Sequence, residues 1–292
     1  MHIFLYGPPG TGKSTIGQIL ARNLSLPFVD VDRVVESHAG MFISQIMERQ
    51  GEAAFRDMET AALKDTVGHA FSVTNLQDKV IALGGGALLR DENRVIAEKH
   101  GTVVLLMAEL STLLERLKND AGKRPLLAGD VHEKLASLLD QRREHYSSFA
   151  VQYHVDGKTA AQNASQIQIK LGRFHLRAMG DYDVLVKEVE QVGNLLYKRG
   201  LLNPIVVTDE NVAKFHAESV MVSLRNAGFT PQIITIPAGE DYKNLETIQK
   251  LWHGFLEHAL DRKSTVIALG GGVIGDMTGF AASTYMRGIN WV

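Results

Sequence analysis

The residues whose types and spacing most clearly predict chemistry lie near the amino terminus of this chain. The segment Gly7–Ser14 (GPPGTGKS) fits the pattern G-x-x-x-x-G-K-[ST], in which backbone N–H groups surround the phosphates of a nucleotide. The helix that follows such a loop adds its partial positive charge. Lys13 is expected to bridge the β- and γ-phosphates, and the hydroxyl of Ser14 to bind Mg²⁺. The pattern predicts a site for a nucleotide and a magnesium ion.

Two carboxylates follow the next apolar run. Phe28 and Val29 are expected to form a short strand, which ends in Asp30, Val31 and Asp32. The i, i+2 spacing predicts that both carboxylates lie on one side of the strand. One would reach the Mg²⁺ through water and the other would orient an acceptor hydroxyl, because carboxylates are a regular part of metal-bound phosphoryl transfer.

Arginines farther along the chain predict a second anion site. Arg56 and Glu59 are spaced i, i+3, so a helix brings them side by side. Glu59 would then aim the Arg56 fork, which suits a carboxylate; the alternative is an exposed helix ion pair. Arg124 follows a polar stretch, as expected of a loop that closes a cation over the γ-phosphate. Arg142 and Arg143 lie on a predicted helix, where either is also compatible with a solvent-exposed position.

The elements that must position these residues alternate between strands and helices. His2–Tyr6, Val80–Leu83 and Thr102–Met107 are apolar runs, as expected for strands buried on both faces of a parallel sheet. Ser14–Ser25 carries apolar residues along one helical face. This alternation predicts α/β layers, and the chain turns polar before a boundary that we place near Gly172.

A second β/α series is expected after this boundary. The patterns predict strands at Tyr182–Val186, Pro204–Thr208, Gln232–Ile236 and Thr265–Leu269. Apolar residues spaced from Leu245 to Leu256 predict an amphipathic helix between the last two strands.

One heptapeptide, VIALGGG, occurs twice, at Val80–Gly86 and at Val266–Gly272. Each copy predicts a buried strand that ends in glycines, whose missing Cβ lets a ligand approach the backbone. Ligands bind at the carboxyl ends of strands in open α/β sheets. The flanking sequences do not match, so the repeat does not indicate a duplicated domain.

Residues 1–170 together resemble shikimate kinase. That family has the phosphate loop, a strand-end D-x-D, an F-R-x-x-E helix, a G-G-G turn, an R-P-L lid and a late R-x-x-x-Y. The matching segments, in chain order, are Gly7–Ser14, Asp30/Asp32, Phe55–Glu59, Gly84–Gly86, Arg124–Leu127 and Arg142–Tyr146. The resemblance implies a P-loop kinase fold, a three-layer α/β/α arrangement around a parallel sheet.

The resemblance also implies an activity: ATP-dependent phosphorylation of the shikimate 3-hydroxyl, in chorismate and aromatic amino acid biosynthesis. Ser14 and, through water, Asp30 would hold Mg²⁺, while Asp32 would act on the acceptor proton. Lys13 and Arg124 would stabilise the transferred phosphoryl group. The ATP-binding residues would be Gly10, Thr11, Gly12, Lys13, Ser14, Thr15, Arg116 and Arg124, with Arg116 stacking on adenine. The shikimate-binding residues would be Asp32, Arg56, Gly84, Gly85, Gly86 and Arg142.

The late arginine motif departs from the family. Many members have a proline between the arginine and the tyrosine, whereas Glu144 and His145 fill this gap here. The i to i+4 spacing to Tyr146 favours Arg142 over Arg143 as the substrate residue.

Residues 173–292 resemble the N-terminal NAD-binding domain of 3-dehydroquinate synthase. The resemblance rests on P-x-G-E-x-x-K, on G-G-G-V-I-G-D and on the segment Tyr285–Gly288. It implies an incomplete Rossmann-like α/β domain, with Arg287 reaching toward a substrate phosphate. The NAD-binding residues would be Asp209, Glu240, Lys243, Gly272 and Asp276.

This second family continues beyond the point that Val292 reaches, into a helical domain with a glutamate and two histidine metal ligands. We therefore expect a part of a longer bifunctional enzyme, without 3-dehydroquinate synthase activity from these residues alone, because the chemistry needs that metal. NAD would serve the second domain if completed.

Composition excludes several other classes. The 292 residues, 45% hydrophobic and 22% charged, match a folded protein of about two domains. A net charge of −2, with neither half basic, argues against nucleic acid as a partner. With no cysteine, disulfides, thiolate zinc sites and cysteine nucleophiles are impossible. Apolar runs are too short for a membrane span.

From these features we expect a cytoplasmic protein whose partners are small molecules, shikimate and ATP. They are compatible with a monomeric kinase part and with a dimeric synthase part when that part is complete.

Two other functions stay open on the sequence alone. Another small-molecule P-loop kinase, such as a gluconate kinase, would share the phosphate loop, and substrate-dependent ADP release separates the two. A nucleotide-binding module without turnover is the third hypothesis. The set of Lys13, Asp32 and Arg124 argues against it.

Overall fold

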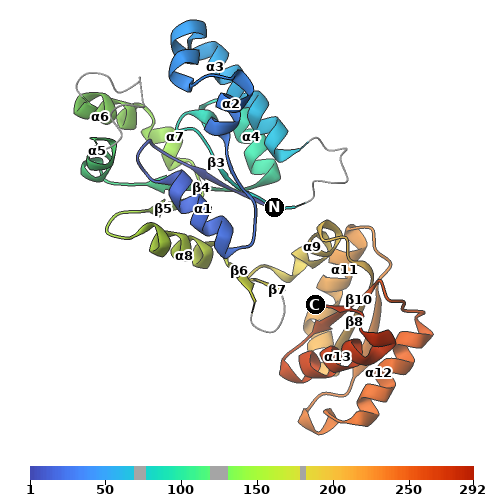
Figure 1. The fold of residues 1–292 in the computed structure, drawn as a ribbon. Coiled ribbons are helices and arrows are strands. Elements are labelled where there is room, and N and C mark those ends of the chain that lie inside the picture. Colours follow the sequence, from blue (N-terminus) through green and yellow to red (C-terminus); the bar gives the residue numbers. More distant parts are fainter. Residues whose placement is uncertain (69–76, 119–130, 178–181) are drawn as a thin grey trace. The chain divides into compact units, whose positions relative to one another are not determined.

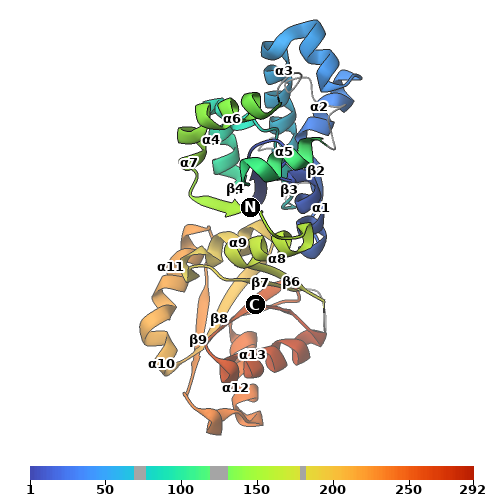
Figure 2. The same ribbon diagram turned by 90° about the vertical axis from the view of Figure 1, so that its left-hand side faces the viewer.

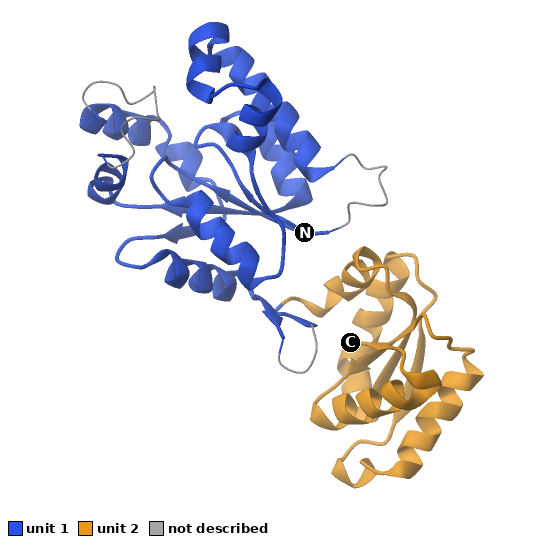
Figure 3. Cartoon of the chain, viewed as in Figure 1, with its two compact units in different colours: residues 1–186 blue, residues 187–292 orange. Residues whose placement is uncertain are grey.

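The computed structural model describes residues 1–68, 77–118, 131–177 and 182–292. The chain forms two compact units, Met1–Val186 and Lys187–Val292 (Figure 3). We describe each unit by itself.

Unit 1 is built on a parallel sheet with the strand order β2-β3-β1-β4-β5. Figure 1 labels three of its strands, β3, β4 and β5. Its strands are β1 (His2–Tyr6), β2 (Phe28–Asp30), β3 (Val80–Ala82), β4 (Gly101–Met107) and β5 (Val151–His154). Its helices are α1 (Lys13–Asn23), α2 (Val31–Ala39), α3 (Ile43–Val67), α4 (Asp91–His100), α5 (Leu110–Lys118), α6 (Val131–Gln141), α7 (Arg143–Ser147) and α8 (Ala160–Leu171), with the short 3₁₀ helix η1 (Ala87–Leu89) after β3.

Successive residues of the central strand β1 face opposite sides of this sheet, as strand geometry requires. Ile3 and Leu5 pack into one core with side chains from α1, α5 and α8. Phe4 and Tyr6 pack into a second core with side chains from α2, α3, α4 and α7. Because both faces are covered, β1 is buried throughout, which explains its continuous apolar sequence.

Unit 1 ends in an antiparallel hairpin of β6 (Arg173–Leu176) and β7 (Tyr182–Leu185). The expected strand at Tyr182–Val186 therefore exists but does not open the second parallel series. Arg173 donates to the Met1 carbonyl oxygen and forms an ion pair with Asp78, at 2.9 Å. These contacts join the hairpin to unit 1, so the compact units divide after Val186 rather than near Gly172.

Unit 2 has a parallel sheet with the order β11-β10-β8-β9. Figure 2 shows two of its strands, β8 and β9. Its strands are β8 (Leu202–Asp209), β9 (Gln232–Ile236), β10 (Ser264–Leu269) and β11 (Asn290–Trp291). Its helices are α9 (Val192–Lys198), α10 (Glu210–Val212), α11 (Glu218–Asn226), α12 (Leu245–Glu257) and α13 (Gly272–Thr284). Apolar side chains of α12 and α13 cover one face, and those of α9 and α11 cover the other. The predicted α/β class is confirmed for both units.

Candidate active site

The phosphate loop joins the end of β1 to the start of α1. Gly12 caps α1 in the left-handed region, with φ of 86°, a conformation that a side chain disfavours. Lys13 Nζ donates to the carbonyl oxygens of Gly7 and Pro8, at 2.7 and 3.0 Å. The buried Thr11 hydroxyl also donates to the Pro8 carbonyl oxygen, at 2.8 Å. The loop is thus held in a defined shape by its own side chains.

Two further predicted nucleotide residues lie at this loop. Arg116 Nη1, from α5, donates to the carbonyl oxygens of Gly10 and Thr11, at 3.2 and 3.4 Å. Thr15 is exposed in the first turn of α1. Arg124 lies outside the described residues.

Ser14 and Asp30 are brought together. The Ser14 hydroxyl donates to Asp30 Oδ2 at 2.6 Å, and Asp30 Oδ1 accepts from the backbone N–H of Asp32 at 3.2 Å. The expectation that both aspartates share one side of a strand is wrong. Asp30 ends β2 and caps α2, and Asp32 lies in the first turn of that helix. The Ser14 and Asp30 oxygens are of the kind that Mg²⁺ prefers.

Arg56 and Glu59 form the predicted pair on α3, with 2.8 Å between Arg56 Nη1 and Glu59 Oε2. The alternative of an exposed ion pair is wrong, because the side chains are only 13% and 1% exposed. Burial raises the pKa of Glu59, and the guanidinium of Arg56 offsets part of this effect. Missing from the sequence prediction was Glu52, whose Oε1 lies 3.1 Å from Arg56 Nη2. Its i, i+4 spacing to Arg56 was the available signal.

The three glycines after β3 lie against the predicted substrate residues. A Cβ on Gly84 would lie 2.4 Å from Glu59 Oε1 and 2.9 Å from Asp32 Oδ1. A Cβ on Gly86 would lie 2.7 Å from Arg56 Nη2. Glycine is therefore required here so that charged side chains from α2 and α3 can approach the backbone.

Gly85 connects this group with two other parts of the site. A Cβ there would lie 3.3 Å from the Gly7 carbonyl oxygen, so the glycine turn borders the phosphate loop. The Gly85 carbonyl oxygen accepts from Arg142 Nη1 at 2.7 Å and from the Tyr146 hydroxyl at 3.2 Å. Arg143, by contrast, forms an ion pair with Asp140 in which both side chains are exposed. Of the two arginines, the structure brings Arg142 to the glycine turn.

An aromatic group behind the glycine turn was not predicted. The Tyr6 hydroxyl lies 3.1 Å from His145 Nε2, and the Tyr6 ring packs against His145, Tyr146 and Phe149. Burial raises the pKa of Tyr6 and lowers that of His145. No spacing rule relates Tyr6 to His145, because 139 residues separate them.

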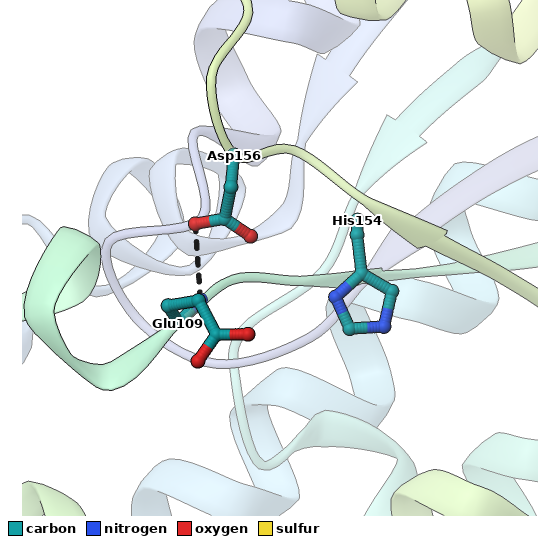
Figure 4. Close-up of side chains that lie close together, drawn as sticks. All are labelled: Glu109, His154 and Asp156. Carbon is teal, nitrogen blue, oxygen red and sulfur yellow. Dashed lines mark hydrogen bonds between the residues drawn. The ribbon is translucent and has the colours of Figure 1, made fainter.

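Glu109, His154 and Asp156 form a separate group of possible metal ligands in the described residues, with ligand atoms within 4.8 Å of one another (Figure 4). Glu109 and His154 are exposed. Asp156 Oδ1 accepts from the backbone N–H of Glu109 at 3.0 Å, just before α5 begins. This bond gives Asp156 a structural role that needs no metal.

In unit 2, three of the residues predicted to bind NAD meet. Lys243 Nζ lies 2.7 Å from Asp276 Oδ2 and 3.4 Å from Glu240 Oε1. Gly272 begins α13, and Gly270 and Gly271 separate it from the end of β10. Asp209, at the end of the neighbouring strand β8, accepts from two backbone N–H groups and caps α10. All five predicted residues lie at or beyond the carboxyl ends of strands of one parallel sheet. Asp209 ends β8, Glu240 and Lys243 follow β9, and Gly272 and Asp276 follow β10.

Within the described residues, every helix is too short or too polar to cross a membrane.

Two family models match this chain. The family model "Shikimate kinase" matches residues 9–171, and the model "3-dehydroquinate synthase N-terminal" matches residues 233–292. A shikimate kinase of Sulfurihydrogenibium sp. is 37% identical over 172 residues, covering 59% of this chain and 98% of that protein. A solved shikimate kinase of Acinetobacter baumannii, in complex with shikimate, covers 58% of this chain and 92% of its own, with a TM-score of 0.53 and 33% identity.

One relative matches along both units. It is a bifunctional shikimate kinase/3-dehydroquinate synthase of Thermotoga maritima, 29% identical over 293 residues, which cover 99% of this chain and 54% of that protein. This chain thus spans about half the length of that relative. Because a family model matches more than half of the residues, the chain belongs to the shikimate kinase family.

Proposed function

We propose that unit 1 phosphorylates shikimate to shikimate 3-phosphate with ATP. The observation that carries this proposal is the place of Gly85, which borders the phosphate loop and accepts a hydrogen bond from Arg142. A phosphate donor site and a group of arginine and carboxylate side chains therefore adjoin, as transfer between two bound molecules requires. The shikimate kinases to which the chain is similar support the choice of substrate.

In this proposal each group keeps the role that the sequence predicts. Lys13 and Arg124 stabilise the transferred phosphoryl group, and Arg116 borders the base of ATP. Ser14 and Asp30 supply oxygen atoms for Mg²⁺, which would neutralise phosphate charge. The remaining proposed contacts, to shikimate, are those of Asp32, Arg56, Gly84, Gly85, Gly86 and Arg142.

The direct test is ADP release by the full chain with ATP and Mg²⁺. We expect release that depends on shikimate, with shikimate 3-phosphate identified by mass. Release with gluconate but not with shikimate would contradict the proposal and favour the other small-molecule kinase. ATP binding without release under either condition would favour a non-catalytic binding module.

Asp32→Asn tests the acceptor side of the site. We expect near-normal ATP binding and turnover reduced about 100-fold or more, because general base catalysis typically contributes about 10²–10⁴-fold. Asp65→Asn, an exposed change of the same charge on α3, is the matched control and should leave turnover unchanged. Equal turnover in Asp32→Asn and the control would remove Asp32 from the mechanism.

For unit 2 we propose a nucleotide site at the carboxyl ends of β8, β9 and β10, with NAD as the ligand. The contacts among Glu240, Lys243 and Asp276 support it, as does the match to the synthase model over residues 233–292. Calorimetry with NAD tests this proposal. Heat that is equal for the original chain and for Lys243→Met would contradict it.

A further inference from the structure

The Arg56 guanidinium contacts two carboxylates in very different surroundings. Glu59 Oε2 holds Nη1 at 2.8 Å, and the Glu59 side chain is 1% exposed. Glu52 Oε1 holds Nη2 at 3.1 Å, and the Glu52 side chain is 62% exposed. Arginine binds a carboxylate most strongly when two of its N–H groups donate in parallel. A substrate carboxylate that enters the site therefore meets an Arg56 guanidinium whose Nη2 already has a carboxylate partner.

The two glutamates differ in how readily they can leave Arg56. If Glu59 moved away from Arg56, a charge would be left buried without a partner, because the Glu59 side chain is enclosed by α3 and the glycine turn. A Cβ on Gly84 would already touch Glu59 Oε1, so Glu59 has little room to move. Glu52 can rotate into water, and ion pairs as exposed as this one contribute little stability.

We propose that Glu52 sets the affinity for the acidic substrate: its carboxylate occupies Arg56 Nη2 in the empty site and gives way to the substrate carboxylate. This inference rests on the proposed function. Binding is then an exchange of one carboxylate for another, and the Glu52–Arg56 contact is broken each time the acid enters. Glu59 keeps the guanidinium in position throughout the exchange.

A structural role for Glu52 predicts the opposite result. Gly51 has φ of 82° and ψ of 170° within α3, so Glu52 begins a new helical segment, where a negative charge favours the helix. If Glu52 served only to support the helix and orient Arg56, its neutralisation would weaken substrate binding. If Glu52 competes with the substrate, its neutralisation strengthens binding even when the helix loses stability.

The experiment compares Glu52→Gln with Glu48→Gln in the full chain. Glu48 is exposed on the same helix, so both variants lose the same charge. We expect the Kd for shikimate, measured by calorimetry, to fall about 1.5- to 5-fold in Glu52→Gln and to stay unchanged in Glu48→Gln. The value of kcat/KM for shikimate should rise by the same factor, and added salt should narrow the difference.

Two results would overturn the inference while leaving the proposed function intact. One is an equal or higher Kd in Glu52→Gln, and the other is an equal fall in both variants, which would be a general charge effect. Failure of the original chain to bind shikimate would overturn the proposed function and this inference together.

Discussion

Both copies of VIALGGG form a strand of a parallel sheet, but the glycines that follow the two strands lie in different surroundings. Val80–Ala82 forms β3 between β2 and β1, and the second copy forms β10 between β11 and β8. After β3, the glycines are crowded by Glu59, Asp32 and Arg56. After β10, a Cβ on Gly271 or Gly272 would meet nothing within 4 Å. The first glycine lies close to a side chain in both copies, Gly84 to Glu59 and Gly270 to Ile274, whereas the second and third glycines are crowded only in unit 1.

The largest expected effect comes from Gly84→Ala. The new Cβ would displace Glu59, and through it Arg56, so we expect kcat/KM for shikimate to fall about 100-fold or more. The free energy of unfolding should fall by about 1–3 kcal/mol, as is typical of overpacking. Urea unfolding and steady-state kinetics measure the two effects.

Gly271→Ala is the comparison in the second copy, at a glycine that has open space around it. Gly271 has φ of −86° and ψ of −163°, which alanine can adopt. The free energy of unfolding of unit 2 should change by no more than about 0.5 kcal/mol in this variant. Equal destabilisation by both substitutions would show that the crowding around the first copy is not what distinguishes the two turns.

Acid should weaken the sheet that holds the first copy. His2 lies on β1, which pairs with β3, and its Nδ1 accepts from the backbone N–H of Lys79. Burial lowers its pKa from 6.5 to about 4. Below pH 6.5 the unfolded chain therefore binds a proton that the folded chain does not, and stability falls as pH falls toward 4. Between pH 6.5 and pH 5 the loss should be about 2 kcal/mol.

The measurement is urea unfolding of unit 1 in the full chain, followed across this pH range. In His2→Gln, which keeps an acceptor but does not titrate, this part of the pH dependence should vanish. A slope that persists unchanged in the variant would assign it to other groups.

Gly272→Ala should not destabilise the fold. Gly272 lies in the first turn of α13 with open space around it, so alanine should stabilise unit 2 by at most about 1 kcal/mol. If NAD approaches this backbone, the added methyl group should nevertheless weaken NAD binding. Gly275→Ala, on the same helix and also in open space, is the control, and equal NAD binding by both variants would contradict a contact at Gly272.

The sequence predicted best what depends on local pattern and burial. His2–Tyr6 forms a strand over the predicted residues and is buried throughout, because a strand covered on both faces must be apolar along its length. The contact between Arg56 and Glu59 followed from helical spacing. Its burial did not, since that depends on the glycine turn after β3, far along the chain.

The predictions were wrong where a local sequence pattern was compatible with more than one structure. The Asp30–Asp32 spacing was assigned to a strand, but Asp30 caps a helix that begins at Val31. The strand predicted at Tyr182–Val186 did not reveal its partner, which is the antiparallel β6.

That hairpin also has a practical consequence for dividing the polypeptide. The backbone N–H of Val186 donates to the Gly172 carbonyl oxygen at 2.8 Å, so the residues on either side of the hairpin meet at its base. A clone of the amino-terminal half that stops at Gly172 would discard Arg173 and leave Asp78 without that partner. A stop codon after Val186 would keep the hairpin and its ion pair with Asp78. We therefore expect the two units to be expressed separately with the smallest loss of stability when the chain is divided there.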